Sequence, residues 1–181
     1  MIRALALLTL ALAAPAAADT VRTEAASLRY ALPGAWTRVP APSDMRAAQY
    51  TIPRAGGDTE DGEMILFFFG ESKGGGVDDN LERWYGQFTQ PDGKPSRDAA
   101  VLTIHTVKGL RVTAVDLSGT YAGMQAPGAE KSPPKPGFRM LAAVIEGKGG
   151  PWFFKAVGPT ATLAQAKPDF DKLLDSLDVH R

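Results

Sequence analysis

The sequence lacks cysteine entirely and has only two histidines among its 181 residues. Without cysteine the chain can form neither a disulfide nor a thiolate site, and zinc sites built on cysteine are excluded. The chain also lacks an excess of either charge, because 20 basic residues balance 20 acidic ones. A nearly neutral chain has no general electrostatic attraction to nucleic acid or to acidic membranes. We therefore expect no nucleic-acid partner.

A hydrophobic run long enough to cross a bilayer is missing as well. The segment Ala4–Ala14 is apolar, but it is too short to span a hydrocarbon layer of ~30 Å. A basic residue precedes this segment, and Ala16–Ala18 supplies the small side chains that signal peptidase recognises. The pattern predicts a signal peptide over residues 1–18, cleaved near Ala18, and a periplasmic or secreted mature protein that does not insert into a membrane.

What the sequence does contain is organised around Met64–Gly70, its densest apolar run. Consecutive apolar residues between acidic residues and a glycine predict a strand that is buried on both faces, which requires layers above and below its sheet. Links that resemble hairpins predict a mainly antiparallel sheet. The other predicted strands are Ala25–Leu32, Met45–Ile52, Val101–Val107, Leu110–Leu117, Phe138–Glu146 and Trp152–Val157.

Two helices are predicted to cover this sheet. Asp78–Phe88 places apolar side chains three and four positions apart, and Asp79 is the expected N-cap residue. Thr160–Leu177 has the same periodicity, but Pro168 inside it predicts a kink or two short helices. The predicted fold class is α/β of the α+β type: a single-domain α/β/α sandwich over residues 19–181, with a mainly antiparallel sheet of about six or seven strands.

Three features that carry chemistry in other proteins are incomplete here. Gly74–Gly76 precedes a helix but lacks the lysine and hydroxyl of a phosphate loop, and acidic residues begin that helix. The acidic segment Asp58–Glu63 matches a calcium loop only loosely, so a solvated hairpin tip is favoured over a weak cation site. His105 is expected to be a satisfied sheet residue. The sequence therefore predicts no catalytic residue, no metal site and no cofactor.

One candidate recognition surface is the segment Gly123–Gly137, which is rich in proline and glycine and is predicted to form a long mobile loop. Loops on a rigid scaffold often carry recognition. Trp36 follows a turn and is predicted to be partly exposed. The candidate partner-binding residues are Trp36, Met124, Lys131 and Lys135.

The alternative is a ligand pocket between the sheet and a helix. Aromatic side chains at strand and helix spacing can line such a pocket, although a place in the core is favoured for them. The candidate pocket residues are Trp84, Phe88 and Trp152.

The turn Pro33–Trp36 after the first strand and the ending Trp152–Pro159, followed by Thr162, Phe170 and Leu174–Leu177, resemble the PsbP-like fold. That superfamily includes the PsbP extrinsic subunit of photosystem II and the DcrB-like exported proteins of bacteria. The resemblance covers most of residues 25–178, and the final strand, turn and helix are its most specific part. It implies an α/β/α sandwich with an antiparallel sheet and a small binding or accessory module. It transfers no functional residue and does not support a photosystem role.

The leading expectation is an exported, non-enzymatic binding or accessory protein that contacts another protein of the cell envelope. A carrier of a small apolar ligand is the alternative. A hydrolase that uses carboxylates is a further alternative, for which the sequence shows only scattered acids.

Overall fold

The computed structural model of the protein describes residues 20–123 and 133–179. Its strands form two sheets in which all pairs are antiparallel. The larger sheet has eight strands in the order β3-β4-β5-β10-β9-β8-β6, with β7 also paired to β8. Its strands are β3 (Thr37–Val39), β4 (Arg46–Ile52), β5 (Gly62–Phe67), β6 (Phe88–Thr89), β7 (Val101–Val107), β8 (Leu110–Tyr121), β9 (Lys135–Glu146) and β10 (Trp152–Pro159).

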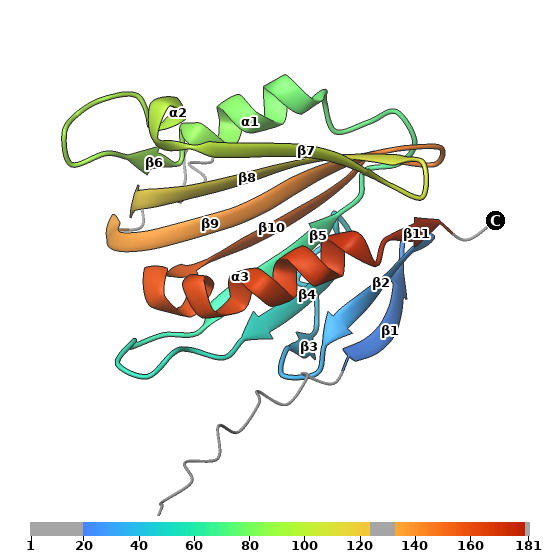
Figure 1. The fold of residues 1–181 in the computed structure, drawn as a ribbon, viewed down its shortest axis with the longest axis horizontal. Helices are drawn as coiled ribbons and strands as arrows, with labels where there is room; N and C mark the ends of the chain where they lie inside the picture. Colours follow the sequence, from blue (N-terminus) through green and yellow to red (C-terminus); the bar gives the residue numbers. More distant parts are fainter. Residues whose placement is uncertain (1–19, 124–132, 180–181) are drawn as a thin grey trace, which may run out of the picture.

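The larger sheet is covered on both faces, as the buried strand predicted (Figure 1). One face carries α1 (Val77–Tyr85) and the short α2 (Ser96–Ala99), and the other carries α3 (Thr160–Asp175). The smaller sheet, β1-β2-β11, packs beside α3. Its strands are β1 (Thr20–Ala25), β2 (Leu28–Pro33) and β11 (Asp178–Val179). The predicted α+β class, the sandwich and the antiparallel sheet are therefore confirmed.

The first predicted strand does not join the main sheet. Ala26 and Ser27 both have positive φ, of 50° and 62°, and the chain reverses there so that β2 pairs with β1. The sequence did not predict β1 because its side chains are mostly polar and exposed. Inside β2 the predicted alternation holds, since Leu28, Tyr30 and Leu32 face the core.

Trp36 is buried, and the prediction that it is partly exposed is wrong. Only 5% of its surface is exposed, and it belongs to the core on the α3 face. Its backbone N–H donates to the carbonyl of Pro33 at 2.9 Å. The turn therefore ends in the core, because a tryptophan side chain gains more by burial than any other side chain of this segment.

The connection before α1 is packed rather than a simple linker. Gly74 has φ +95°, and a Cβ there would lie 2.7 Å from both Phe69 and Phe153, so only glycine fits. Asn80 donates from Nδ2 to the carbonyls of Gly74 and Gly76 at 3.0 and 2.8 Å. The glycines let the chain cross closely over the aromatic core before the helix begins.

The N-cap of α1 is Gly76, so the predicted N-cap at Asp79 is wrong by three positions. Asp79 instead accepts a hydrogen bond from the Gly76 N–H at 3.1 Å, as the third helical residue of a capping box does. The helix ends at Tyr85, and Phe88 lies in β6. Leu81, Trp84 and Tyr85 are buried, as the periodicity predicted.

Helix α3 is one continuous element with Pro168 inside it, so of the two predicted alternatives, a kink or two short helices, the second is wrong. Its apolar face buries Leu163, Phe170 and Leu173 completely or nearly so. That burial outweighs the hydrogen bond that the proline removes.

Strand β9 begins at Lys135, so the last three residues of the predicted loop Gly123–Gly137 belong to a strand.

Candidate functional site

The centre of the candidate site is Lys155, a lysine within the otherwise apolar strand β10. Its neighbours Phe154 and Ala156 point into the α3-side core, so strand alternation directs Lys155 to the α1 face. There it lies between Ile65 of β5 and Ala142 of β9, which are its register partners. Only 8% of Lys155 is exposed. The sheet therefore fixes a basic side chain at a buried position.

Two neutral groups contact the Lys155 ammonium. Nζ donates to Oε1 of Gln87, which is itself buried, and lies 3.5 Å from the hydroxyl of Tyr121. Nζ also lies 5.4 Å from the centre of the Tyr121 ring, within reach of a cation–π interaction. Within the described residues, no ion pair joins Lys155 to a carboxylate at 4.0 Å or less. This is unusual, because buried charges in proteins are normally paired.

The electrostatics of the site follow from that burial. Loss of water lowers the pKa of Lys155 from its ordinary value of 10.5 to about 8, and the carboxylate of Glu63 offsets this only in part. Arg46 repels the ammonium and adds to the lowering. Burial also raises the pKa of Tyr121 above its usual range, so its phenol stays neutral beside the amine.

Lys155 opens onto a cleft of about 390 Å³. The cleft lies on the α1 face where β5, β10, β9 and β8 run side by side. Its apolar walls are contributed by alternate residues of these strands, and its aromatic side is the stacked pair Tyr121 and Phe138, with ring centres 6.2 Å apart. The apolar lining residues are Ile65, Phe67, Phe138 and Val157.

The rim of the cleft carries charges that are already paired. Lys135 binds Glu60 at 2.5 Å, and Arg46 lies 3.5 Å from Glu63. Asp61 is a third acid in the lining and accepts from the backbone N–H of Arg54 at 3.1 Å. The outer part of the cleft is thus polar with satisfied pairs, whereas the inner part holds one cation that has no acidic partner among the residues described.

The acidic side chains of Asp58–Glu63, the possible cation site, each bind a different partner within the fold. Asp58 accepts from the N–H and hydroxyl of Thr162 at 2.9 and 2.5 Å and so caps α3. Glu60 and Glu63 bind Lys135 and Gln49. Within residues 20–123 and 133–179, no three acidic, histidine or cysteine side chains gather as metal ligands. Asp61 and Glu63 are exposed, and the segment lies at the link between the antiparallel strands β4 and β5, as the predicted solvated hairpin tip requires.

Of the predicted partner-binding residues, Lys135 lines the Lys155 cleft, and Trp36 is in the core on the opposite side of the sheet. Met124 and Lys131 lie outside the described residues. Lys155 itself was missed. The signal that could have found it is a lysine in the middle of a strand whose other residues are apolar on both faces.

The predicted pocket of Trp84, Phe88 and Trp152 is not assembled. Trp84 and Phe88 belong to the core under α1, whereas Trp152 belongs to the core on the α3 face. Trp152 lines a separate hollow of about 840 Å³ at the tips of several hairpins, where it stacks on Phe68. Its indole N–H donates to the Ala26 carbonyl at 2.8 Å. The three residues are chiefly core, as the sequence favoured.

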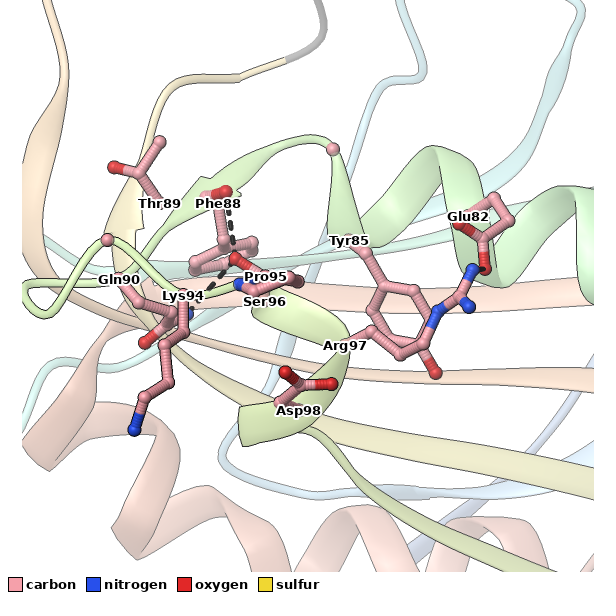
Figure 2. Close-up of a pocket in the computed structure, with 12 residues that line it drawn as sticks. Glu82, Tyr85, Phe88, Thr89, Gln90, Lys94, Pro95, Ser96, Arg97 and Asp98 are labelled. Carbon is pink, nitrogen blue, oxygen red and sulfur yellow. Dashed lines mark hydrogen bonds and ion pairs between the residues drawn. The ribbon is translucent and has the colours of Figure 1, made fainter.

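Phe88 lines another hollow, of about 660 Å³, between α1, β6 and α2 (Figure 2). Its polar side chains bind one another. Ser96 donates to the Phe88 carbonyl at 2.9 Å and accepts from Gln90 at 3.1 Å, and Arg97 pairs with Glu82. Nothing in this hollow resembles the buried cation of the Lys155 cleft, which we therefore take as the candidate site.

The architecture matches solved structures. Over 94% of this chain and 98% of the other, it is similar to cyanobacterial PsbP from Synechocystis sp. PCC 6803, with a TM-score of 0.53 and 15% identity. The fold is PsbP-like. It is also similar to PA94, a protein of unknown function from Pseudomonas aeruginosa, over 90% of this chain and 98% of that one, with a TM-score of 0.50 and 11% identity.

Comparison of the sequence with known families and proteins gives no match. No family model and no curated protein matches the chain. The likeness to the two solved structures therefore establishes the fold, and the choice of site rests on the geometry.

In the part of the chain that the structure describes, no helix has the length and apolar character needed to cross a bilayer.

Proposed function

We propose that the protein is a non-enzymatic binding or accessory protein and that the cleft around Lys155 is its recognition site. The observation that supports this is the buried ammonium, which lines a cleft and has no carboxylate partner in the described residues. Concave sites with apolar walls and a few convergent polar groups are the usual form of small-ligand sites. A PsbP-like fold built from hairpins provides the rigid strands that hold the cleft open.

The proposal is tested by filling the cleft. Val157→Trp places a large side chain on the cleft wall, and Val21→Trp on the exposed strand β1 is the matched control, since 57% of Val21 is exposed. Wild type and both variants are purified natively from the host, and bound small molecules and proteins are compared by mass spectrometry. Species that wild type and the Val21 variant retain and the Val157 variant loses support the proposal. The same set in all three rejects it.

The partner of such a protein is proposed to be another component of the cell envelope. Export is the reason: the signal peptide pattern over residues 1–18 predicts a mature chain that begins at Asp19. Intact-mass measurement of the protein from the periplasm of its host tests this directly. A mass that corresponds to residues 19–181 is expected, and a cytoplasmic protein that retains residues 1–18 would contradict it.

A hydrolase that uses carboxylates is the second candidate, because three acids line the same cleft. Glu60 and Glu63 are each held by basic side chains, which suits structural ion pairs better than a proton donor and a nucleophile. A Glu63→Gln variant separates the two functions. Loss of a hydrolytic activity measured on the wild type, with ligand retention unchanged, would favour the enzyme.

A further inference from the structure

The cleft has an uneven distribution of charge that restricts what it can hold. This inference rests on the proposed function and names the class of ligand. The inner wall carries Lys155, whose Nζ contacts, among residues 20–123 and 133–179, the neutral groups of Gln87 and Tyr121. The rim carries three acids against two bases. The inner end of the cleft therefore favours a negative group, and the outer end does not.

A single negative charge fits the inner end better than several. Lys155 is the only base of the lining that lacks an acidic partner within the described residues, because Lys135 and Arg46 lie beside Glu60 and Glu63. A ligand with two or more negative charges would bring its outer charges against the acidic rim. Polyphosphates and nucleotides are therefore disfavoured by like-charge repulsion.

The remainder of the cleft suits an apolar body of modest size. Ile65 and Val157 flank Lys155 on the sheet, and Phe138 forms the aromatic side. A volume of about 390 Å³ is at the lower end of the range for small-molecule sites. A short aliphatic or aromatic group fits this space, and its burial would further exclude water from the ammonium.

We propose that the cleft binds a small monocarboxylate, with the carboxylate on Lys155 Nζ and the apolar body against Ile65, Val157 and Phe138. The ligand supplies the counter-ion that the fold omits, and charge-assisted hydrogen bonds of this kind are the strong ones. Two sources offer this chemistry: a free carboxylic acid and the C-terminus of a peptide. Both present one carboxylate beside an apolar group.

The test uses titration calorimetry on the full mature chain with hexanoate, hexanol and hexylamine as probes. Hexanoate is expected to bind most tightly, hexanol more weakly, and hexylamine not at all. Lys155→Met keeps an unbranched side chain that is one atom shorter and removes the charge, and it is expected to weaken hexanoate binding at least about tenfold. Lys94→Met, at a largely exposed lysine outside the cleft, is the matched control and should bind as wild type does.

Two results would overturn the proposal: binding of neither hexanoate nor a peptide with a free C-terminal carboxylate by the wild type at millimolar concentration, or equal affinity of the bound carboxylate for wild type and Lys155→Met. Because that variant could be misfolded, the wild type gives an independent measurement. Hexanoate should shift the Cε resonance of Lys155 in lysine-labelled protein and leave that of Lys94 unchanged. Absence of this shift at saturating hexanoate also rejects the proposal.

The two sources are separated with a pair of peptides that end in leucine, one with a free C-terminus and one amidated. Preference for the free peptide over hexanoate indicates a peptide end, and the reverse indicates a free acid. The proposed function and this inference can fail separately. If Val157→Trp loses the natural species but neither hexanoate nor the free peptide binds, the cleft is a recognition site and its ligand is not a monocarboxylate.

Discussion

The two faces of the eight-stranded sheet bury polar groups in different ways. On the α3 face, the hydroxyls of Tyr30 and Tyr50 lie 2.6 Å apart inside an aromatic and aliphatic core. One hydroxyl donates to the other, so each of the two oxygens has a hydrogen-bond partner inside the core. On the α1 face, Lys155 is buried beside Gln87 and Tyr121 and opens onto a cleft.

The difference separates a structural face from a functional one. A neutral pair that is satisfied within the fold adds stability and needs nothing from outside. A buried cation without an acid costs stability, and proteins tolerate such groups chiefly at functional sites. The comparison therefore predicts that changes on the α3 face alter stability, whereas changes at Lys155 alter binding and the dependence of stability on pH.

The largest effect is expected from Phe154→Ala on the α3 face. Phe154 is fully buried and packs edge-on against Tyr30, with ring centres 5.2 Å apart. Its truncation leaves a cavity and should lower the free energy of unfolding by about 3–5 kcal/mol. Urea denaturation measures this, with Val21→Ala on β1 as the surface control. A loss no larger than that of the control would contradict the assignment of this face as the main core.

A smaller effect is expected from Tyr30→Phe, which leaves the Tyr50 hydroxyl buried without its partner. The cost should be about 1–3 kcal/mol in the free energy of unfolding. Removing both hydroxyls should cost less than the sum of the two single changes, because the double variant leaves no unsatisfied group. A double-mutant cycle in urea measures the coupling, and additive values would show that the pair does not act as a unit.

On the α1 face, Lys155 should make stability rise with pH. Its pKa is about 8 in the folded chain and near 10.5 when unfolded, so between these values the unfolded chain binds more protons. Lys155 therefore destabilises the fold below about pH 8, and this effect fades as pH rises, by no more than about 1.4 kcal/mol per pH unit. The Lys155→Met variant should exceed wild type in stability at pH 7, and the gap should narrow by pH 9.5.

This dependence is measured by urea unfolding at several pH values, and Lys94→Met is the control that should follow wild type. The charged or titratable groups near Lys155 are Glu63, Arg46 and Tyr121. Working below pH 10 limits the contribution of tyrosine ionisation, because burial raises the pKa of Tyr121. A gap that stays constant with pH would show that Lys155 is not desolvated.

The smallest effect is expected from Asp58→Ala at the start of α3. Asp58 accepts from the Thr162 backbone N–H, and the loss of a helix cap of this kind costs about 1 kcal/mol. Asp58→Asn, which keeps an acceptor oxygen, should lose less. Both are measured by thermal unfolding, and equal losses would indicate that Asp58 acts through its charge on the helix dipole rather than as a cap.

Most elements of the fold could be predicted from the sequence, because their burial patterns are local. The apolar run at Met64–Leu66 is buried on both faces, and the stripe of α1 packs as its spacing requires. The segments that escaped prediction are short or polar. Strand β1 forms because its backbone pairs with one edge of β2, and β11 forms because its backbone pairs with Arg29 and Leu28 on the other edge.

The candidate site was less predictable. Lys135 was selected from the sequence as part of a loop, yet it lines the cleft as the first residue of β9 and as the partner of Glu60. Tyr121, Glu63 and Lys155 come from three further strands. Their meeting depends on the pairing of β5 with β10, which are far apart in the chain, together with the pairing of β9 with both β10 and β8.

By itself, the sequence determined that the protein is a cysteine-free sandwich around a doubly buried strand, because hydrophobic periodicity and turn residues act over a few positions. The tertiary structure decided which face is closed and which is open. Most of the α3 face is covered because a long helix and the small sheet both pack on it, and the hollow that Trp152 lines lies at the hairpin tips. The α1 face stays open beyond the shorter α1, and within the described residues strand alternation leaves Lys155 buried there beside a cleft.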